Sequence, residues 1–158
     1  MKVTIIAVGK IKEKYIIEGI REYEKRLKGY VELNIVEVPD VAAPENLSEA
    51  GKLKVLHEEG QKILSKLPSG KTYALAINGK TYSSEQLAKR FENDGIMGDS
   101  QVNFIIGGSL GLSDEVYEKC DEKISFSALT FPHQLMRLIF VEQLYRAYRI
   151  INGHPYHK

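Results

Sequence analysis

The chain has 158 residues, of which 43% are hydrophobic and 27% are charged, and its formal net charge is +1. These values are typical of one ordinary globular domain, and no apolar run approaches the roughly 20 residues that a membrane span requires. The single cysteine, Cys120, excludes an internal disulfide and a cysteine-based zinc site, and the lack of a signal-peptide pattern at the start favours a reduced, cytoplasmic setting.

The first half of the chain predicts two strands and two helices. Residues 2–9 form a nearly continuous apolar run, as buried parallel strands do, and residues 10–14 are a basic connection. An amphipathic helix follows, and residues 31–38 then form the second strand. A second helix starts near Asn46 or Ser48. Its residues at helical spacing are Leu53, Leu56, Gly60, Ile63, Leu64 and Leu67.

The middle of the chain predicts a third strand and a third helix. The strand covers residues 72–77 and ends at the turn signal Asn78-Gly79. Ser83 and Gln86 have the spacing of a capping box, which marks the start of the helix. A polar loop over residues 93–101 then returns the chain to the next strand.

Strands alternate with helices five times along the chain, without an internal repeat or a linker. This pattern predicts a single α/β domain with a parallel sheet and right-handed crossovers. Ligands of such sheets bind outside the carboxyl ends of the strands. Two stretches of the sequence bring loops to that edge, and we predict that they form the walls of one ligand site.

The first of these stretches, residues 102–112, runs from an apolar strand into a glycine-rich turn. The glycine spacing is not that of a Rossmann fingerprint, and the Gly-Lys-Ser/Thr of a P-loop is missing. Asp114 and Glu115 follow in the first turn of a helix and already use its dipole, which makes a poor phosphate site. The glycines therefore predict a ligand that contacts bare backbone without a phosphate, such as an adenosine or a sulfonium compound. A plain turn is the alternative.

The second stretch, residues 124–134, is a strand that continues through small residues into a helix begun by Pro132. Residues 126–131 offer backbone groups, small side chains and two aromatic edges, which suit an adenine ring and a thioether. The alternative is an ordinary strand end. His133 lies in the first turn of the helix, where it either exchanges a proton with a substrate base or has a structural role.

The last helix, at about residues 132–151, is apolar on two sides. One stripe is predicted to face the sheet, and the second is predicted to be covered by a dimer partner, because a chain this small has little protein to cover both. The alternative is that both stripes are core. The predicted sheet-facing residues are Leu135, Leu138, Ile139, Tyr145 and Ile151, and the second stripe is Met136, Phe140, Leu144 and Ala147.

Basic residues gather at both ends of the chain. Residues 1–30 hold eight Lys or Arg and four Glu, and residues 131–158 hold four against one, whereas residues 31–130 hold ten against sixteen acidic residues. The basic ends are interpreted either as a local phosphate-binding face or as solvated helix faces.

The C-terminal tail, residues 152–158, is rich in Pro, Tyr and His directly after a packed helix, which is unusual for a frayed terminus. Its aromatic and basic residues suit stacking on a base and contacts with phosphate, and a disordered tail is the alternative. The candidate nucleic-acid contacts are Arg146, His154, Tyr156 and Lys158. His57 lies on a charged helix face with Glu58 and Glu59 and is given no role. No cluster has metal-ligand spacing, so no metal is expected.

Five motifs, taken in order, resemble the family of ribosomal RNA large subunit methyltransferase H, the small pseudouridine N3-methyltransferases of the SPOUT class. They read IIAVGK, IIGGSLGL, SFSALTFPHQ, EQLYRA and HPYHK. The similarity spans the whole chain, and the combination is specific although any single motif is weak. It implies an α/β knot fold of one domain, 1–158, in which residues 102–158 form a deep trefoil knot, the cofactor site and the dimer helix of an obligate homodimer.

The resemblance also implies a substrate and a cofactor. The methyl donor is S-adenosylmethionine, and the acceptor is N3 of a pseudouridine in the 23S rRNA hairpin that bridges the ribosomal subunits. The implied cofactor-binding residues are Leu75, Gly107, Gly108, Phe126, Ser127, Ala128, Leu129, Thr130 and Phe131. Since the sulfonium already carries an activated methyl group, the protein must align it with N3 and help to remove the N3 proton, without a metal. The catalytic candidates are His133, Arg137 and His157, with solvent as the alternative base.

Two further hypotheses concern the partners. The tail of one subunit is expected to cover the cofactor of the other, and the enzyme is expected to need an assembled ribosome, because a small and nearly neutral protein grips free RNA weakly. DNA and membranes are not expected partners. The alternatives are a flavodoxin-like or nucleotide-binding module, a non-catalytic ribosome-associated factor, and a methyltransferase with another RNA target, such as a tRNA uridine.

Overall fold

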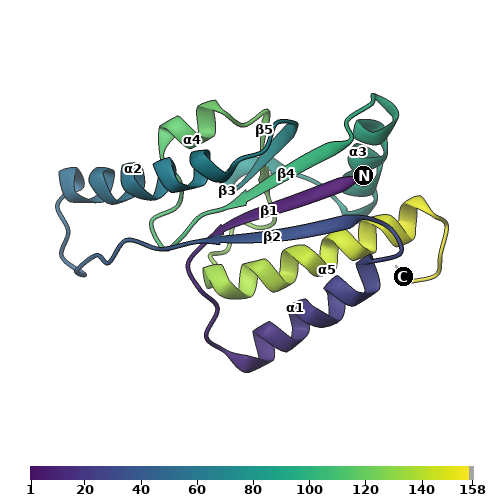
Figure 1. The fold of residues 1–158 in the computed structure, drawn as a ribbon, viewed down its shortest axis with the longest axis horizontal. Helices are drawn as coiled ribbons and strands as arrows, with labels where there is room; N and C mark the ends of the chain where they lie inside the picture. The colour runs from purple at the N-terminus through teal and green to yellow at the C-terminus, as the bar shows by residue number, and fades with distance from the viewer. Residues whose placement is uncertain (157–158) are drawn as a thin grey trace.

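A computed structural model describes residues 1–156 as a five-stranded parallel sheet with helices on both faces (Figure 1). The strand order is β2-β1-β4-β3-β5. The elements are β1 (Lys2–Val8), α1 (Lys14–Leu27), β2 (Glu32–Val38), α2 (Glu49–Lys66), β3 (Lys71–Thr81), α3 (Ser84–Ile96), β4 (Gln101–Ile106), α4 (Asp114–Glu118), β5 (Glu122–Ser125) and α5 (His133–Ile151). The predicted α/β domain with a parallel sheet is confirmed. Within residues 1–156, no helix combines the length and the apolar composition needed to cross a membrane.

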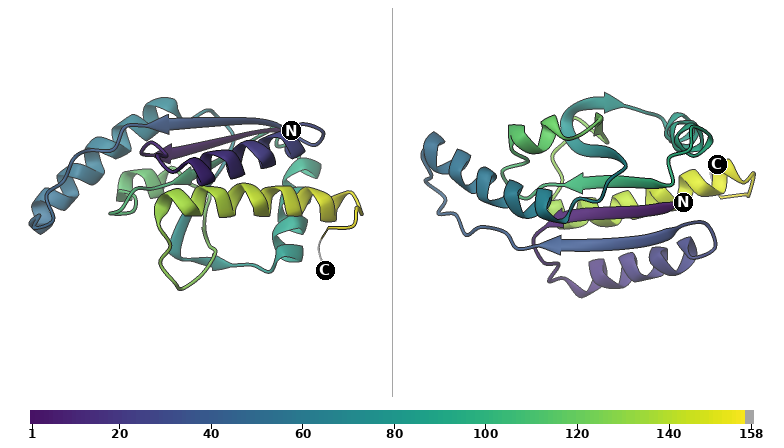
Figure 2. Two further views of the ribbon diagram at one scale, coloured as in Figure 1. Left: turned by 90° about the horizontal axis from the view of Figure 1, so that it is seen from below. Right: turned by 45° about the horizontal axis from the view of Figure 1, so that its top comes forward.

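The helices form two layers. Helices α1, α3 and α5 cover one face of the sheet, and α2 and α4 cover the other (Figure 2). Successive side chains of a strand point to opposite faces, so a strand between two layers must be apolar on both. In β1, Val3 and Ile5 join the core beneath α1, α3 and α5, while Ile6 and Val8 join the core beneath α2 and α4. This explains the continuous apolar run at the start of the chain.

Serine residues begin three of the helices, because a serine oxygen accepts a hydrogen bond from an otherwise unpaired N–H of the first turn. Ser48 Oγ accepts from the N–H of Gly51 at 3.0 Å and starts α2. Ser83 and Gln86 form the predicted capping box of α3. Ser113 caps α4 in the same manner. The predicted starts of α2 and α3 are therefore confirmed.

Three local predictions are wrong. Strand β3 does not end before Asn78-Gly79 but continues through this pair to Thr81. Helix α3 continues to Ile96, so the connection to β4 is shorter than the expected loop of residues 93–101. The side chain of Leu53 is 65% exposed and does not belong to the packed face of α2. For β3 the pairing of Lys80 and Thr81 with β5, which the local pattern does not contain, decides the outcome.

The two apolar stripes of α5 are interchanged relative to the prediction. Phe140, Leu144 and Ala147 are each 1% exposed and pack into the core on the sheet, whereas much of the predicted sheet-facing stripe is only half-buried. The reason is that α5 lies between α1 and α3, which cover its flanks (Figure 2). Gly19 of α1 permits this close approach, because a Cβ there would lie 2.9 Å from Cδ1 of Leu138.

Candidate functional site

A cavity of about 860 Å³ opens at the carboxyl edge of the sheet. Its walls are the end of β3, the loop after β4, the segment after β5 and the first turns of α5. The lining residues are 75–78, 106–111, 117, 124, 126–127, 129–133 and 136. The two stretches that the sequence marks therefore border one cavity, whose size lies in the range of small-molecule and cofactor sites.

Eight of the nine predicted cofactor residues line this cavity. They are Leu75, Gly107, Gly108, Phe126, Ser127, Leu129, Thr130 and Phe131. The ninth, Ala128, is exposed and is not part of the lining. Several lining residues were not predicted, among them Ile77 and Asn78 of β3, Tyr117 of α4 and Met136 of α5. These four come from three separate elements, and the local sequence carries no signal that brings them to one cavity.

The glycine-rich turn after β4 closes tightly on itself. The N–H of Gly111 donates to the carbonyl of Gly108 at 3.1 Å, and Gly111 has φ +85°. A Cβ on Gly107 would lie 2.5 Å from the carbonyl oxygen of Gly111, and a Cβ on Gly108 would lie 3.1 Å from Cγ1 of Val8. The glycines are therefore required by the chain's own backbone and by β1. The close approach of a ligand to these glycines stays a prediction, and the structure adds this second reason for them.

The segment after β5 is held in shape by its own side chains. Ser127 Oγ accepts from the N–H of Leu129 at 2.9 Å, and Ser125 Oγ donates to the carbonyl of Ser127 at 3.2 Å. Phe126 packs on Phe140 of α5, with ring centroids 5.8 Å apart. Leu129 is 69% exposed although it is a large apolar residue that lines the cavity. A ligand or a second protein chain that covered the cavity mouth would bury this side chain.

Strand β3 bulges where it borders the cavity. Ile124 of β5 is paired with both Leu75 and Lys80, so the intervening residues are looped out of the ladder. Gly79 permits the return of the strand, because a Cβ there would lie 2.7 Å from backbone atoms of Ile124. The Asn78-Gly79 pair thus lies in an irregularity of the pairing between β3 and β5. Bulges of this kind often redirect side chains beside a ligand site.

His133 is the predicted catalytic residue that the structure places in the cavity lining. It is half-buried at the first position of α5, and its Nε2 lies 3.7 Å from the position that a Cβ of Gly9 would occupy. Of the other two candidates, Arg137 is buried outside the lining, and His157 lies outside the described residues.

Arg137 forms a buried connection between α5 and the sheet. Its Nη1 donates to Glu37 Oε2 at 2.5 Å, and its Nη2 donates to the carbonyl oxygen of Gly9 at 2.9 Å. The Arg137 side chain is 2% exposed, and its Nε has no hydrogen-bond partner among the described residues. These contacts position the start of α5, and therefore His133, against the end of β1.

Glu59, which the sequence pattern assigns to a charged helix face, is a buried carboxylate next to the cavity. It is 5% exposed, and its Oε2 accepts from the N–H of Val41 at 3.0 Å. Burial raises the pKa of its carboxyl, and the Val41 hydrogen bond and the nearby His133 oppose the rise. Its Oε1 lies 3.7 Å from the position of a Cβ on Gly108. The sequence does hold a signal for its burial, because Glu59 lies four residues after Val55 and four before Ile63 and so shares their buried helix face.

The described tail lies at the opposite end of α5 from the cavity. His154 Nδ1 is 2.8 Å from the hydroxyl of Tyr30, and the Tyr156 hydroxyl donates to Glu142 Oε1 at 3.0 Å. Arg146 also donates to Glu142, at 2.6 Å, and lies over the Tyr156 ring at 4.7 Å. Two of the predicted RNA contacts, Arg146 and Tyr156, are thus packed together on α5, and His154 is held by Tyr30 in the turn after α1. The fourth, Lys158, lies outside the described residues.

Comparisons with known proteins give one consistent family. A family model described as "Predicted SPOUT methyltransferase" matches residues 1–157. The chain is 55% identical to the proteins called "Ribosomal RNA large subunit methyltransferase H" of Enterococcus faecalis and of Carboxydothermus hydrogenoformans, over 100% of both chains in each case. A solved structure of a methylase family protein from Neisseria gonorrhoeae is similar in fold, with a TM-score of 0.50 and 11% identity over 90% of this chain and 81% of that chain.

Proposed function

Because the chain belongs to the family of SPOUT methyltransferases, we propose that it transfers a methyl group from S-adenosylmethionine to the RNA of the large ribosomal subunit. The acceptor in this proposal is N3 of a pseudouridine in the 23S rRNA hairpin that bridges the two subunits. The observation that carries the proposal is the cavity of about 860 Å³ at the carboxyl edge of the sheet, lined by eight of the nine residues that the family resemblance assigns to the cofactor.

The cavity suits the cofactor chemically. Apolar side chains, such as those of Leu75, Phe126 and Met136, offer surfaces for an adenine ring and a thioether, and the glycine turn offers backbone groups for polar atoms. S-adenosylmethionine supplies an activated methyl group when it is bound. The task of the chain is therefore to hold the cofactor and the target base in line and to exclude water from the cavity.

A proton must leave N3 when the methyl group arrives, and we assign its removal to His133. This imidazole lines the cavity, and the connection formed by Arg137 fixes the start of the helix that carries it. Arg137 therefore positions His133 in this proposal and does not itself contact the base. His157 keeps its proposed catalytic role as a residue of the tail, which a second subunit would bring to the cavity.

The proposed active form is a homodimer in which the α5 helices of two subunits pack against each other. Leu135 and Ile139 lie half-buried on α5 and are suited to this contact. The described part of the tail reaches back along α5 only to Glu142, nine residues or about 14 Å from His133, and it does not line the cavity of its own chain. In an antiparallel pair the tail of one subunit meets the cavity of the other. Residues 102–158, which would form the trefoil knot of the family, contain the tail and most of the residues that line the cavity.

The RNA contacts in this proposal are Arg146, His154, Tyr156 and Lys158, and the substrate is the assembled ribosome in the cytoplasm. A net charge of +1 gives little general attraction for RNA, so a preformed RNA surface is expected to be required. Since Tyr156 is hydrogen-bonded to Glu142, base stacking by its ring requires the tail to be released from α5.

The decisive experiment is methylation of ribosomes from a strain that lacks this gene. We expect isothermal calorimetry to show binding of S-adenosylmethionine, and mass spectrometry of digested rRNA to locate one new N3-methylated pseudouridine in the bridging hairpin. Whole ribosomes should be methylated and naked 23S rRNA should not. Methylation of a tRNA would contradict the substrate, loss of cofactor binding would leave a non-catalytic ribosome factor, and a flavin absorbance of the purified protein would indicate a flavodoxin-like module.

A further inference from the structure

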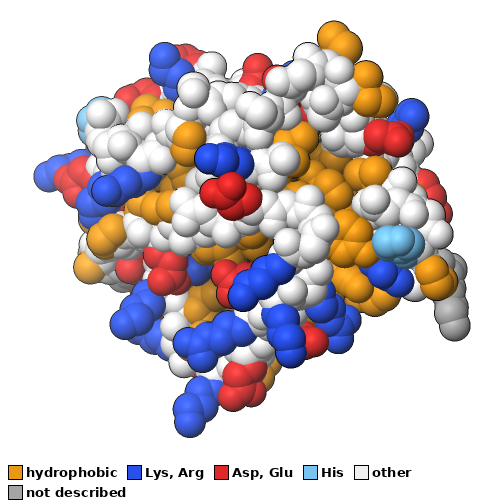
Figure 3. Space-filling model, turned by 45° about the vertical axis from the view of Figure 1, so that its right-hand side comes forward, with side chains coloured by type: hydrophobic (Ala, Val, Ile, Leu, Met, Phe, Trp, Pro, Cys, Tyr) orange, Lys and Arg blue, Asp and Glu red, His pale blue; other side chains and the backbone are white. Residues whose placement is uncertain are grey.

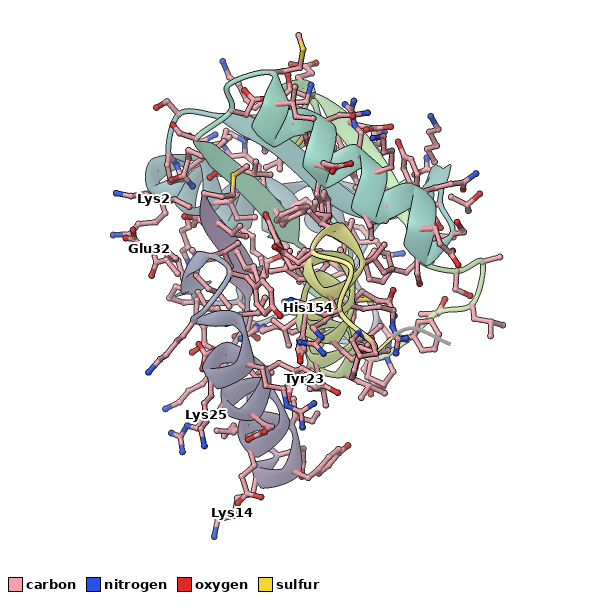
Figure 4. The ribbon with its side chains drawn as sticks, turned by 90° about the vertical axis from the view of Figure 1, so that its right-hand side faces the viewer. Lys2, Lys14, Tyr23, Lys25, Glu32 and His154 are labelled. Carbon is pink, nitrogen blue, oxygen red and sulfur yellow. The ribbon has the colours of Figure 1, made fainter. Side chains whose placement is uncertain are left out.

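The outer face of α1 carries a row of lysine and arginine side chains. Residues 14, 21, 25 and 28 recur at intervals of seven, four and three, so they share one face of the helix. Figure 4 shows Lys14 and Lys25 projecting from α1 away from α5. Together with two lysines of the loop before the helix they form what we call the basic strip, which consists of Lys10, Lys12, Lys14, Arg21, Lys25 and Lys28.

All six side chains of the basic strip are exposed, and none has an ion-pair partner within the described chain. The acidic residues nearby do not neutralise them. Glu22 is paired with Arg26 at 3.0 Å. Glu13, Glu18 and Glu24 lie among the basic residues but form no ion pair with the strip, whose six positive charges outnumber these three. In the space-filling view, lysine and arginine side chains gather over α1 in the lower part of the molecule (Figure 3). For a chain of net charge +1 this is a marked local concentration of positive charge.

The basic strip begins beside the cavity. Gly9, just before Lys10, lies against the imidazole of His133, and the N–H of Lys12 donates to Gln134 Oε1 at 3.4 Å. Both of these partners belong to the first turn of α5, where His133 lines the cavity. From there α1 extends for 14 residues, or about 21 Å, towards the opposite edge of the sheet (Figure 1).

We propose that the basic strip binds the backbone phosphates of the rRNA segment that carries the target base, and so guides this base into the cavity. The inference rests on the proposed function and adds a binding surface to it. Phosphates provide the missing counter-charges along a line, and lysines bind phosphate as point charges without fixing the base sequence. Two copies of the chain do not suit a contact through this surface, because the two basic strips would face each other.

The test compares two triple variants of equal charge change. Arg21→Gln/Lys25→Gln/Lys28→Gln neutralises the part of the strip that lies far from the cavity. Lys54→Gln/Lys66→Gln/Lys119→Gln neutralises three exposed lysines on α2 and at the end of α4, on the other face of the sheet. For each protein, KM and kcat of ribosome methylation and the apparent affinity for ribosomes are measured over a series of salt concentrations, and calorimetry measures the affinity for S-adenosylmethionine.

The strip variant is expected to raise KM about tenfold or more at low salt while kcat and cofactor affinity stay unchanged. The slope of log affinity against log salt should become shallower by roughly two to three, because each lost phosphate contact removes about 0.7 to 0.9. The control variant should behave as the wild type. An unchanged KM and slope in the strip variant, or equal losses in both variants, would overturn the proposal.

A second variant guards against misfolding of α1. Lys10→Gln/Lys12→Gln alters only the loop before the helix, and it should also raise KM and reduce the salt slope while the unfolding midpoint stays unchanged. If the wild type methylates no RNA, the proposed function fails, and the basic strip is then judged by fluorescence-anisotropy binding of the isolated rRNA hairpin to the same variants. Crosslinking of the strip to a ribosomal protein in place of rRNA would refute the phosphate contact.

Discussion

Arg137 and Glu37 form an ion pair in which Nη1 lies 2.5 Å from Oε2, and this pair joins α5 to the ends of β1 and β2. The same Glu37 oxygen accepts from the N–H of Ile11 at 3.3 Å, while the second arm of the guanidinium donates to the carbonyl of Gly9. One arginine therefore holds the strand end, the beginning of the basic loop and the helix of His133 in a single arrangement. Arg137, whose side chain is 2% exposed, is therefore the catalytic candidate that orders the edge of the cavity.

Replacement of Arg137 separates a positioning role from a direct catalytic role. Arg137→Met is expected to lower the free energy of unfolding by about 2–3 kcal/mol, because Gly9 and Glu37 lose charged donors, although Glu37 is half-exposed and is rehydrated in part. Urea unfolding measures this change. Glu37→Gln keeps an acceptor for Ile11 and should lower the stability less. Unchanged stability together with lost activity would instead assign Arg137 a direct contact with the reacting groups.

Replacement of His133 tests the proposed base. His133→Gln is expected to lower kcat by about 10²- to 10⁴-fold, the usual contribution of a positioned general base, while the affinity for S-adenosylmethionine stays within a few-fold. The residual activity should rise with pH, since hydroxide then removes the N3 proton. Single-turnover methylation over a pH series measures this recovery. An equal loss at every pH, together with weaker cofactor binding, would show that His133 shapes only the cavity.

The buried carboxyl of Glu59 predicts a pH-dependent stability. Burial raises the pKa of Glu59, so the folded chain binds this proton more tightly than the unfolded chain does. Its contribution to stability is therefore present at acid pH and is lost as the pH rises from about 4.5 through the folded pKa. Glu59→Gln keeps an acceptor for Val41 and has no charge. Its stability relative to the wild type should increase between pH 4 and pH 8.

The control for Glu59 is its exposed neighbour Glu58 on the same helix. Glu58→Gln removes the same charge from an exposed position and should change the stability by no more than about 0.5 kcal/mol. Chemical denaturation at several pH values gives the comparison. A stability difference for Glu59→Gln that does not change with pH would mean that burial does not shift this group.

Substitution of a glycine in the turn after β4 is expected to lower both the stability of the chain and its affinity for the cofactor. In Gly107→Ala the new Cβ meets the carbonyl oxygen of Gly111 at 2.5 Å, so the turn must open. We expect a cost of about 1–3 kcal/mol, typical of an overpacked site, and weaker binding of S-adenosylmethionine by calorimetry. Gly29→Ala is the matched control, since nothing lies within 4 Å of its added Cβ. Wild-type cofactor affinity in Gly107→Ala would show that the turn does not shape the site.

Local patterns in the sequence determined the elements and the edge at which the cavity lies. The apolar run of β1, the serine caps of α2 and α3 and the glycine turn each act through neighbours within a few residues, which the sequence displays directly. Parallel pairing then places the carboxyl ends of the strands on one side, and the two marked stretches border one cavity there although β3 lies between β4 and β5.

Only the tertiary structure decided which side of α5 is buried, that Arg137 and Glu59 are withdrawn from solvent, and that β3 continues past Asn78-Gly79. Each of these outcomes depends on a contact between segments far apart in the chain. Arg137 meets Gly9 across 128 positions, and Glu59 meets Val41 across 18. Periodicity shows that a helix has an apolar side, but the free energy of packing against α1, α3 and the sheet selects which side becomes core.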